Sequence, residues 1–108
     1  MKTFVMTHIE VEGMHFYPNA PKAVEFLKYP HRHLFTIKAE FEVTDLDREI
    51  EIFMKETEIK YWLHLTYGTP CIFNMMSCEM IAKEILEEFG ASKVIVLEDG
   101  KGGGKVEI

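Results

Sequence analysis

Alternating hydrophobic and polar residues predict two strands in the first part of the chain. In the second of them, every other residue is apolar: Phe35, Ile37, Ala39, Phe41 and Val43. A period of two is typical of a strand with one buried face. The stretch from Thr3 to Val11 is rich in Val, Ile and Phe, which favours an earlier strand. Turn residues at 17–21 separate the two, and a short helical piece is expected to reach Leu27.

The middle of the chain changes to helical spacing. The segment from Met54 to Thr66 places apolar residues on one side of a helix: Ile59, Trp62 and Leu63. Residues 48–53, just before it, could continue the sheet. Gly68 and Pro70 are expected to end the helix.

The clearest helix begins after Ser77, a good N-cap residue, and ends at Gly90, a natural C-terminal cap. Its apolar residues recur on one side: Ile81, Ala82, Ile85, Leu86 and Phe89. Residues 94–97 then predict a buried strand, a glycine-rich turn follows, and residues 105–108 predict a last strand. The expected order is two strands, two helices and two strands, in one α+β domain that spans residues 1–108.

Composition narrows the possible functions. The formal net charge is −6, which argues against a nucleic-acid surface. No run is long and apolar enough to span a bilayer, and the first residues lack the apolar core of a signal peptide, so we expect a cytoplasmic protein without a membrane partner. Only two cysteines occur, Cys71 and Cys78, and their spacing predicts no disulfide framework.

Three histidines form the candidate chemistry. His31 and His33 share odd parity with the apolar residues of their strand, so both imidazoles are expected on the buried face. His15 is in phase with Ile9 if the first strand continues without a break. Three histidines at strand ends could hold a zinc ion, Zn²⁺. The alternative, that these are ordinary half-buried histidines bonded to backbone carbonyls, remains open at this stage.

The residues around these histidines resemble a known family. The segment at positions 11–18, Val-Glu-Gly-Met-His-Phe-Tyr-Pro, and the later Pro-His-Arg-His at 30–33 look like 6-pyruvoyltetrahydropterin synthase and 6-carboxytetrahydropterin synthase. The resemblance implies the tunnelling fold (T-fold), with a four-stranded antiparallel sheet and two helices in the order ββααββ. It also implies zinc on His15, His31 and His33. Arg32 replaces the family's central glycine.

The second half of the chain extends the resemblance to substrate-binding residues. Residues 76–80 are similar to the family's Pro-Thr-x-Glu-Asn motif, which assigns Ser77 and Glu79 to substrate binding, although the proline and asparagine are absent. Glu98 stands at the strand end where the family has a glutamate that holds the edge of the pterin ring. A carboxylate suits this task because its two oxygens can accept two parallel N–H bonds.

The catalytic residues of the family are only partly present. The position where those enzymes place a cysteine is Leu27 or, with the animal-type spacing, Glu25. Some relatives use a glutamate there, so Glu25 is a candidate proton carrier. The family's Asp-His pair falls on Leu63 and His64, which keeps the histidine and loses the carboxylate that would orient it.

The resemblance predicts a zinc-dependent lyase acting on a dihydroneopterin triphosphate-like pterin, or on a deazapurine-like ligand, by metal-assisted proton transfer and elimination. Two alternatives remain open. One is a non-catalytic protein that binds a pterin or purine-like heterocycle, and the other is a structural oligomeric domain. A small domain with long strands would otherwise expose unpaired sheet edges, so we expect a homo-oligomer, and the resemblance implies a hexamer.

Overall fold

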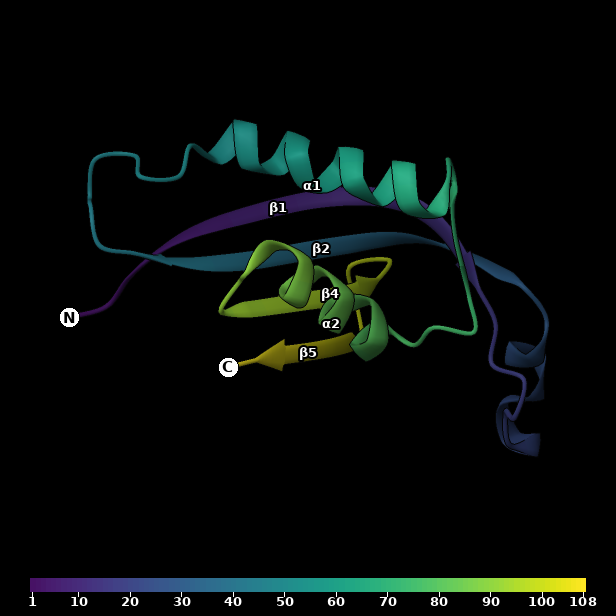
Figure 1. Cartoon of the computed structure of the whole chain (residues 1–108). Helices are drawn as coiled ribbons and strands as arrows, with labels where there is room; N and C mark the ends of the chain where they lie inside the picture. The colour runs from purple at the N-terminus through teal and green to yellow at the C-terminus, as the bar shows by residue number, and fades with distance from the viewer.

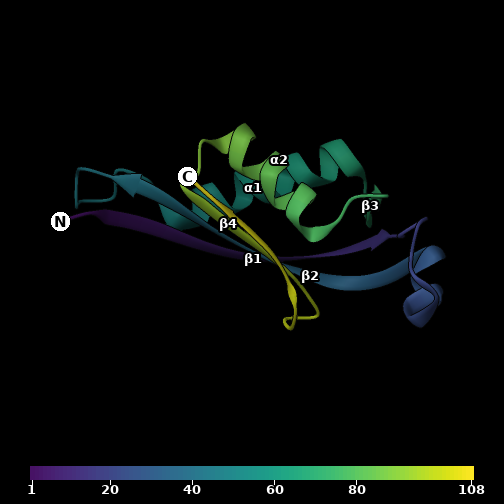
Figure 2. The ribbon, with the colours of Figure 1, turned by 90° about the horizontal axis from the view of Figure 1, so that it is seen from below.

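A computed structural model describes residues 1–108 as one sheet with two long helices packed on one face. The elements are β1 (Thr3–His15), η1 (Lys22–Lys28), β2 (His31–Val43), α1 (Ile52–Tyr67), β3 (Cys71–Asn74), α2 (Cys78–Phe89), β4 (Lys93–Glu98) and β5 (Gly103–Glu107). The strand order is β3-β1-β2-β4-β5; Figure 1 labels β1, β2, β4 and β5, and Figure 2 labels β3. Both long helices lie on the same side of the sheet (Figure 2). No helix has the length and apolar character needed to cross a membrane.

The predicted four-stranded antiparallel sheet in the order ββααββ is wrong. A fifth strand, β3, lies between the two long helices in the sequence and pairs parallel to β1 at Gly13–His15, so the sheet is mixed. The short 3-10 helix η1 is the helical piece expected to reach Leu27, and it makes a third helical element beside the two long helices. β3 escaped prediction because its four residues are too few to show a period. The coarser class, α+β, agrees with the structure.

The long pair of strands β1 and β2 carries the core. Their antiparallel register runs without a break from Thr3 opposite Val43 to His15 opposite His31. Side chains of odd number face the helices, and most of them are buried. The core residues on these two strands are Ile9, Val11, Phe35, Ile37, Ala39 and Phe41. The predicted parity of the strands is therefore confirmed, and β1 extends unbroken to His15.

The helix α2 follows the prediction closely. Ser77 is the N-cap, and its hydroxyl oxygen accepts a hydrogen bond from the Met80 backbone N–H at 3.2 Å. Gly90 ends the helix in the left-handed region, with φ of 66°. Ile81, Ala82 and Ile85 are fully buried against the sheet. The amphipathic stripe of α2 thus covers β4 and β5, while α1 covers β1 and β3.

The possible continuation of the sheet over residues 48–53 is wrong. Residues 44–51 form turns and bends, in which the Glu49 side chain accepts hydrogen bonds from the backbone N–H groups of Thr44 and Asp45, both at 2.9 Å. The helix α1 already begins at Ile52, because the Glu51 side chain caps its first turn by accepting from Met54 N–H at 2.9 Å. Local side-chain bonds of this kind compete with a sheet ladder.

Gly13 makes room for two aromatic rings beneath the end of β1. A Cβ atom at this position would lie 2.7 Å from Cε2 of Phe73 and 3.0 Å from the Phe35 ring. We therefore expect Gly13→Ala to lower the free energy of unfolding by about 1–3 kcal/mol through overpacking. Denaturant unfolding measures this, with Gly102→Ala as the control because nothing lies near its Cβ position. Equal stabilities of the two variants would contradict the prediction.

Candidate metal centre

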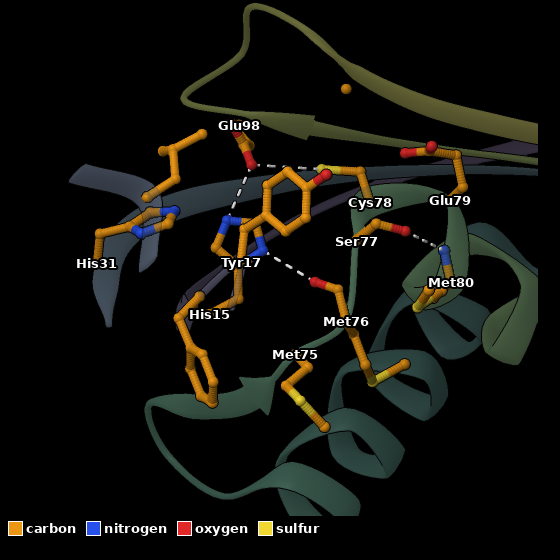
Figure 3. A pocket seen from close by; sticks show the side chains of 13 residues that line it. His15, Tyr17, His31, Met75, Met76, Ser77, Cys78, Glu79, Met80 and Glu98 are labelled. Carbon is orange, nitrogen blue, oxygen red and sulfur yellow. Dashed lines mark hydrogen bonds and ion pairs between the residues drawn. The ribbon is translucent and has the colours of Figure 1, made fainter. Parts of the chain in front are cut away.

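The three predicted histidines meet at one end of the sheet. His15 and His31 face each other across β1 and β2, and His33 lies opposite Gly13, one step along the same face. Their ring centroids are 4.5 to 5.3 Å apart. Glu98, the last residue of the neighbouring strand β4, joins them (Figure 3). The ligating atoms of these four residues all lie within 4.8 Å of one another, so the cluster could hold a metal ion.

Hydrogen bonds to Nδ1 orient two of the imidazoles. His15 Nδ1 donates to the Met76 carbonyl oxygen at 3.0 Å, and His31 Nδ1 donates to the Tyr29 carbonyl oxygen at 2.9 Å. A carbonyl oxygen only accepts, so in each neutral ring the proton sits on Nδ1 and the Nε2 lone pair is free. Metal-binding histidines commonly show this arrangement, since the outer partner fixes both the tautomer and the ring orientation.

His33 is oriented by a carboxylate instead. Its Nδ1 donates to Oδ2 of Asp99 at 2.8 Å, while Oδ1 of Asp99 accepts from the Leu34 backbone N–H at 2.9 Å. The hydrogen bond from the Leu34 N–H is the main cause that lowers the pKa of Asp99, and the bond from His33 lowers it further, so the carboxylate stays ionised. Asp99 itself adopts a left-handed backbone conformation, with φ of 54°. The turn after β4 therefore supplies the partner that aims His33.

The Nε2 atoms of His15 and His33 are buried and have no hydrogen-bond partner. Buried polar nitrogens without partners are uncommon in folded proteins, and each one needs an explanation. A metal ion bound by the cluster would satisfy both atoms at once. The donor set of three imidazoles and one carboxylate, with outer hydrogen bonds already in place, fits such an ion.

His15 is prepared to bind as a neutral base. Burial is the main cause that lowers its pKa, and the neighbouring His31 and His33 lower it further. The hydrogen bond to Met76 and the charge of Glu98 act in the opposite direction, and the net shift is downward. A lowered pKa means that fewer protons compete for the ring nitrogen at neutral pH.

A cavity of about 590 Å³ opens beside the histidines. Most of its wall is apolar or aromatic. The apolar lining residues are Phe16, Tyr17, Leu27, Met75, Met76 and Met80. Ser77, Glu79 and Glu98 supply polar groups, and the first two come from the start of α2 (Figure 3). All three predicted substrate-binding residues thus line the same cavity as His15 and His31.

Cys78 also lines this cavity but is not a ready nucleophile. Burial, followed by the nearby charge of Glu98, raises the pKa of its thiol to about 12. The thiol donates a weak hydrogen bond to Oε2 of Glu98 at 3.7 Å. At neutral pH Cys78 is therefore protonated, and the thiolate that nucleophilic chemistry requires is scarce.

The two predicted proton carriers lie outside the cavity wall. Glu25 is exposed on η1, where its nearest charged partner is Lys28 at 3.4 Å. His64 lies in the last turn of α1, where its Nδ1 donates to the Gly68 carbonyl oxygen at 3.0 Å. Neither residue lines the cavity within this chain.

We expect Asp99→Gly to weaken zinc binding about 10–100-fold, because the variant removes the acceptor that aims His33. Glycine adopts the left-handed conformation of this turn without strain, so the backbone should be kept. Asp99→Asn is the intermediate variant: its single amide oxygen can accept from His33 only if the bond from the Leu34 N–H is given up, so we expect a smaller loss of affinity. Competition with a chromophoric chelator measures both. Equal affinities of Asp99→Gly and the unmodified protein would contradict a role in orienting His33.

Sequence reasoning missed the groups that orient the imidazoles. The carbonyl oxygens of Tyr29 and Met76 leave no trace in the side-chain sequence. Asp99 did leave a signal, since Asp-Gly after a strand indicates a tight turn at the strand end that carries Glu98.

No protein-family model matches the chain, and no curated protein is significantly similar to it. The case for the site therefore depends on its geometry. That geometry consists of three oriented imidazoles, one carboxylate and the cavity that His15, His31 and Glu98 line.

Proposed function

We propose that the protein is a zinc-binding protein of the pterin synthase type, which takes a pterin-like heterocycle into its cavity and acts on it by proton transfer and elimination. One observation carries the proposal. The imidazoles of His15, His31 and His33 are oriented from outside by their Nδ1 atoms, and they converge with Glu98 at the border of a largely apolar cavity.

Zinc suits the donor set better than the common alkaline-earth ions do. Magnesium and calcium prefer oxygen ligands, whereas imidazole nitrogen with one carboxylate is typical of zinc. Three neutral histidines also add no charge, so a divalent cation with one carboxylate keeps a net positive charge that can polarise an oxygen of a bound molecule.

The cavity wall suits a flat heterocycle. The sulfur atoms and flexible side chains of Met75, Met76 and Met80 adapt to an aromatic face. The carboxylate of Glu98 can accept two N–H groups from a ring edge, and Ser77 and Glu79 offer further polar contacts. A pterin or deazapurine-like ring presents such an edge of N–H donors.

Turnover requires a proton carrier beside the substrate, and the positions of the two candidates lead to a second candidate function. Elimination of triphosphate breaks a C–H and a C–O bond, the proton passes to a base, and the triphosphate leaves with the electron pair. Zinc would supply polarisation of the substrate's hydroxyl and carbonyl oxygens. Glu25 and His64 lie outside the cavity of their own chain, which favours a non-catalytic heterocycle-binding protein unless His64 reaches the cavity of a neighbouring copy.

Assembly of several copies is part of the proposal. The outer edge of β1 pairs with β3 only at its end, so residues 3–12 have no strand beside them on that side, and the outer edge of β5 is also free. One edge group is protected, since the His8 backbone N–H donates to Glu56 at 2.9 Å. Unpaired edges of this length favour association. The resemblance makes a homo-oligomer, and specifically a hexamer, the expected assembly.

We also place the protein in the cytoplasm. Its two cysteines, Cys71 and Cys78, are both free and buried. Free thiols are the rule in the reducing cytosol and less common in oxidising compartments.

A binding and turnover experiment tests the proposed function. The zinc-loaded protein is mixed with 7,8-dihydroneopterin triphosphate, binding is followed by pterin fluorescence and turnover by release of triphosphate. Adenosine triphosphate is the control, because it carries the same leaving group without a pterin. Release of triphosphate from the pterin alone supports the enzyme. Binding without release supports the second candidate, and equal behaviour of both compounds contradicts pterin recognition.

A further inference from the structure

Glu98 lies among the histidine nitrogens rather than beside them. Its Oε2 is 2.9 Å from Nε2 of His15, and its Oε1 is 3.7 Å from Nε2 of His33. The first distance, which Figure 3 marks with a dashed line, would suit an ion pair only with a protonated imidazole. In the neutral ring the proton sits on Nδ1, so Nε2 has no proton to donate, and it has no hydrogen-bond partner. The nitrogen and the oxygen are therefore two electron-pair donors in close contact, an arrangement that a cation bound to both would stabilise.

The spacing of these atoms matches that of ligands around one ion. Two ligands about 2 Å from zinc at tetrahedral angles are about 3.3 Å apart. The observed separations of 2.9 and 3.7 Å fall on either side of this value. We propose that Glu98 is the fourth ligand of the metal in the free protein, and that an incoming heterocycle displaces it. This inference rests on the proposed function and concerns regulation of the same site.

Glu98 is better placed to leave the metal than the two less exposed histidines, His15 and His33. Its side chain is 35% exposed, compared with 9% for His15 and 19% for His33. Each histidine is held from outside the cluster by a bond to Nδ1, whereas the only hydrogen bond to the Glu98 carboxylate is the weak one from the Cys78 thiol at 3.7 Å. The Glu98 backbone is fixed, since its N–H donates to the Gly102 carbonyl oxygen at 2.8 Å. Rotation of the side chain alone would release the carboxylate.

The exchange would connect recognition to activation. While Glu98 is bound, four protein ligands surround the metal, a closed arrangement that leaves no coordination position for substrate. A heterocycle with two adjacent N–H donors can draw the carboxylate away, because both of its oxygens then accept hydrogen bonds from the ring edge. Molecules that lack this edge, including small anions, would meet the closed arrangement. A coordination position on the metal would thus become free mainly for a ligand with two adjacent N–H donors.

Cobalt substitution tests the inference, since the visible spectrum of Co²⁺ reports its ligands. Azide serves as the probe of an open coordination position. We compare the unmodified protein with Glu98→Gln, and with Glu88→Gln as the control, because Glu88 is an exposed carboxylate of α2 outside both the cavity and the ligand set. We expect Glu98→Gln to change the spectrum, to bind cobalt roughly 10–100-fold more weakly, and to bind azide more tightly than the other two proteins. Adding 7,8-dihydroneopterin to the unmodified cobalt protein should shift its spectrum toward that of Glu98→Gln.

The outcomes separate this inference from the proposed function. Identical spectra and azide affinities for the unmodified protein and Glu98→Gln would overturn the role of Glu98 while leaving the histidine site intact. An unchanged spectrum on addition of 7,8-dihydroneopterin, at concentrations where fluorescence shows binding, would overturn the displacement. Failure of the proposed metal centre gives a different observation, because the unmodified protein would then bind no cobalt at all.

Discussion

Replacing His31 and His33 together by alanine is expected to abolish zinc binding, from about one ion per chain to none. Two of the four ligands disappear, and the remaining pair, His15 and Glu98, cannot surround the ion. Zinc stabilises the folded state by mass action, by roughly 2.7 kcal/mol at a hundredfold excess over the dissociation constant. The double variant should therefore lose both the bound metal and the rise in unfolding free energy that zinc produces.

Metal content by mass spectrometry and denaturant unfolding with and without zinc measure this result. The chain offers a matched control in His8, which is exposed on β1 and lies outside the cluster. His8→Ala should retain one zinc per chain. His31 and His33 are only partly buried at the end of β2, so the fold should survive their truncation. A double variant that still binds stoichiometric zinc would show that the ion occupies another place.

The histidine cluster could be predicted because it depends on a simple period. Side chains two apart on a strand share a face, so the parity of Phe35 and Ile37 also determines the direction of His33 and His31. The antiparallel register then brings His15 directly opposite His31. The helix α2 was equally accessible, because its cap residues and apolar stripe are local signals.

The parts that escaped prediction depend on contacts between distant segments. β3 is defined by its pairing with β1, and four residues carry no period of their own. The Met76 carbonyl oxygen reaches His15 across 61 positions of the sequence. Glu25 and His64 are candidates only by the family resemblance, and a match in sequence position does not specify which side of the domain a side chain occupies. The positions of these groups follow only from the tertiary structure.

The buried face of β2 joins the core and the site without a boundary. Along the strand, Phe35 belongs to the core, and His33 and His31 belong to the cluster that could hold a metal ion. The Phe35 ring makes edge contacts with His15 and His33 at centroid distances of 5.2 and 5.6 Å. The Phe35 ring therefore packs against two of the imidazoles and supports their positions. A substitution that disturbs the packing of the core at Phe35 should therefore also disturb the positions of the histidine ligands.

Phe35→Ala is accordingly expected to lower the free energy of unfolding by about 3–5 kcal/mol, since the ring is fully buried and packs on Phe73 as well. Among the molecules that remain folded, zinc affinity should fall about tenfold or more, because two imidazoles lose their support. Denaturant unfolding of the metal-free protein gives the first quantity, and chelator competition gives the second.

Two controls separate the local effect from general destabilisation. Val94→Ala removes a fully buried side chain of β4 away from the histidines, and it should cost roughly 2 kcal/mol without changing zinc affinity. Phe53→Ala removes an exposed ring at the start of α1 and should change neither quantity measurably. If Phe35→Ala weakened zinc binding no more than Val94→Ala, the imidazoles would be held by their Nδ1 bonds alone. The Phe35 ring would then contribute only to the stability of the fold.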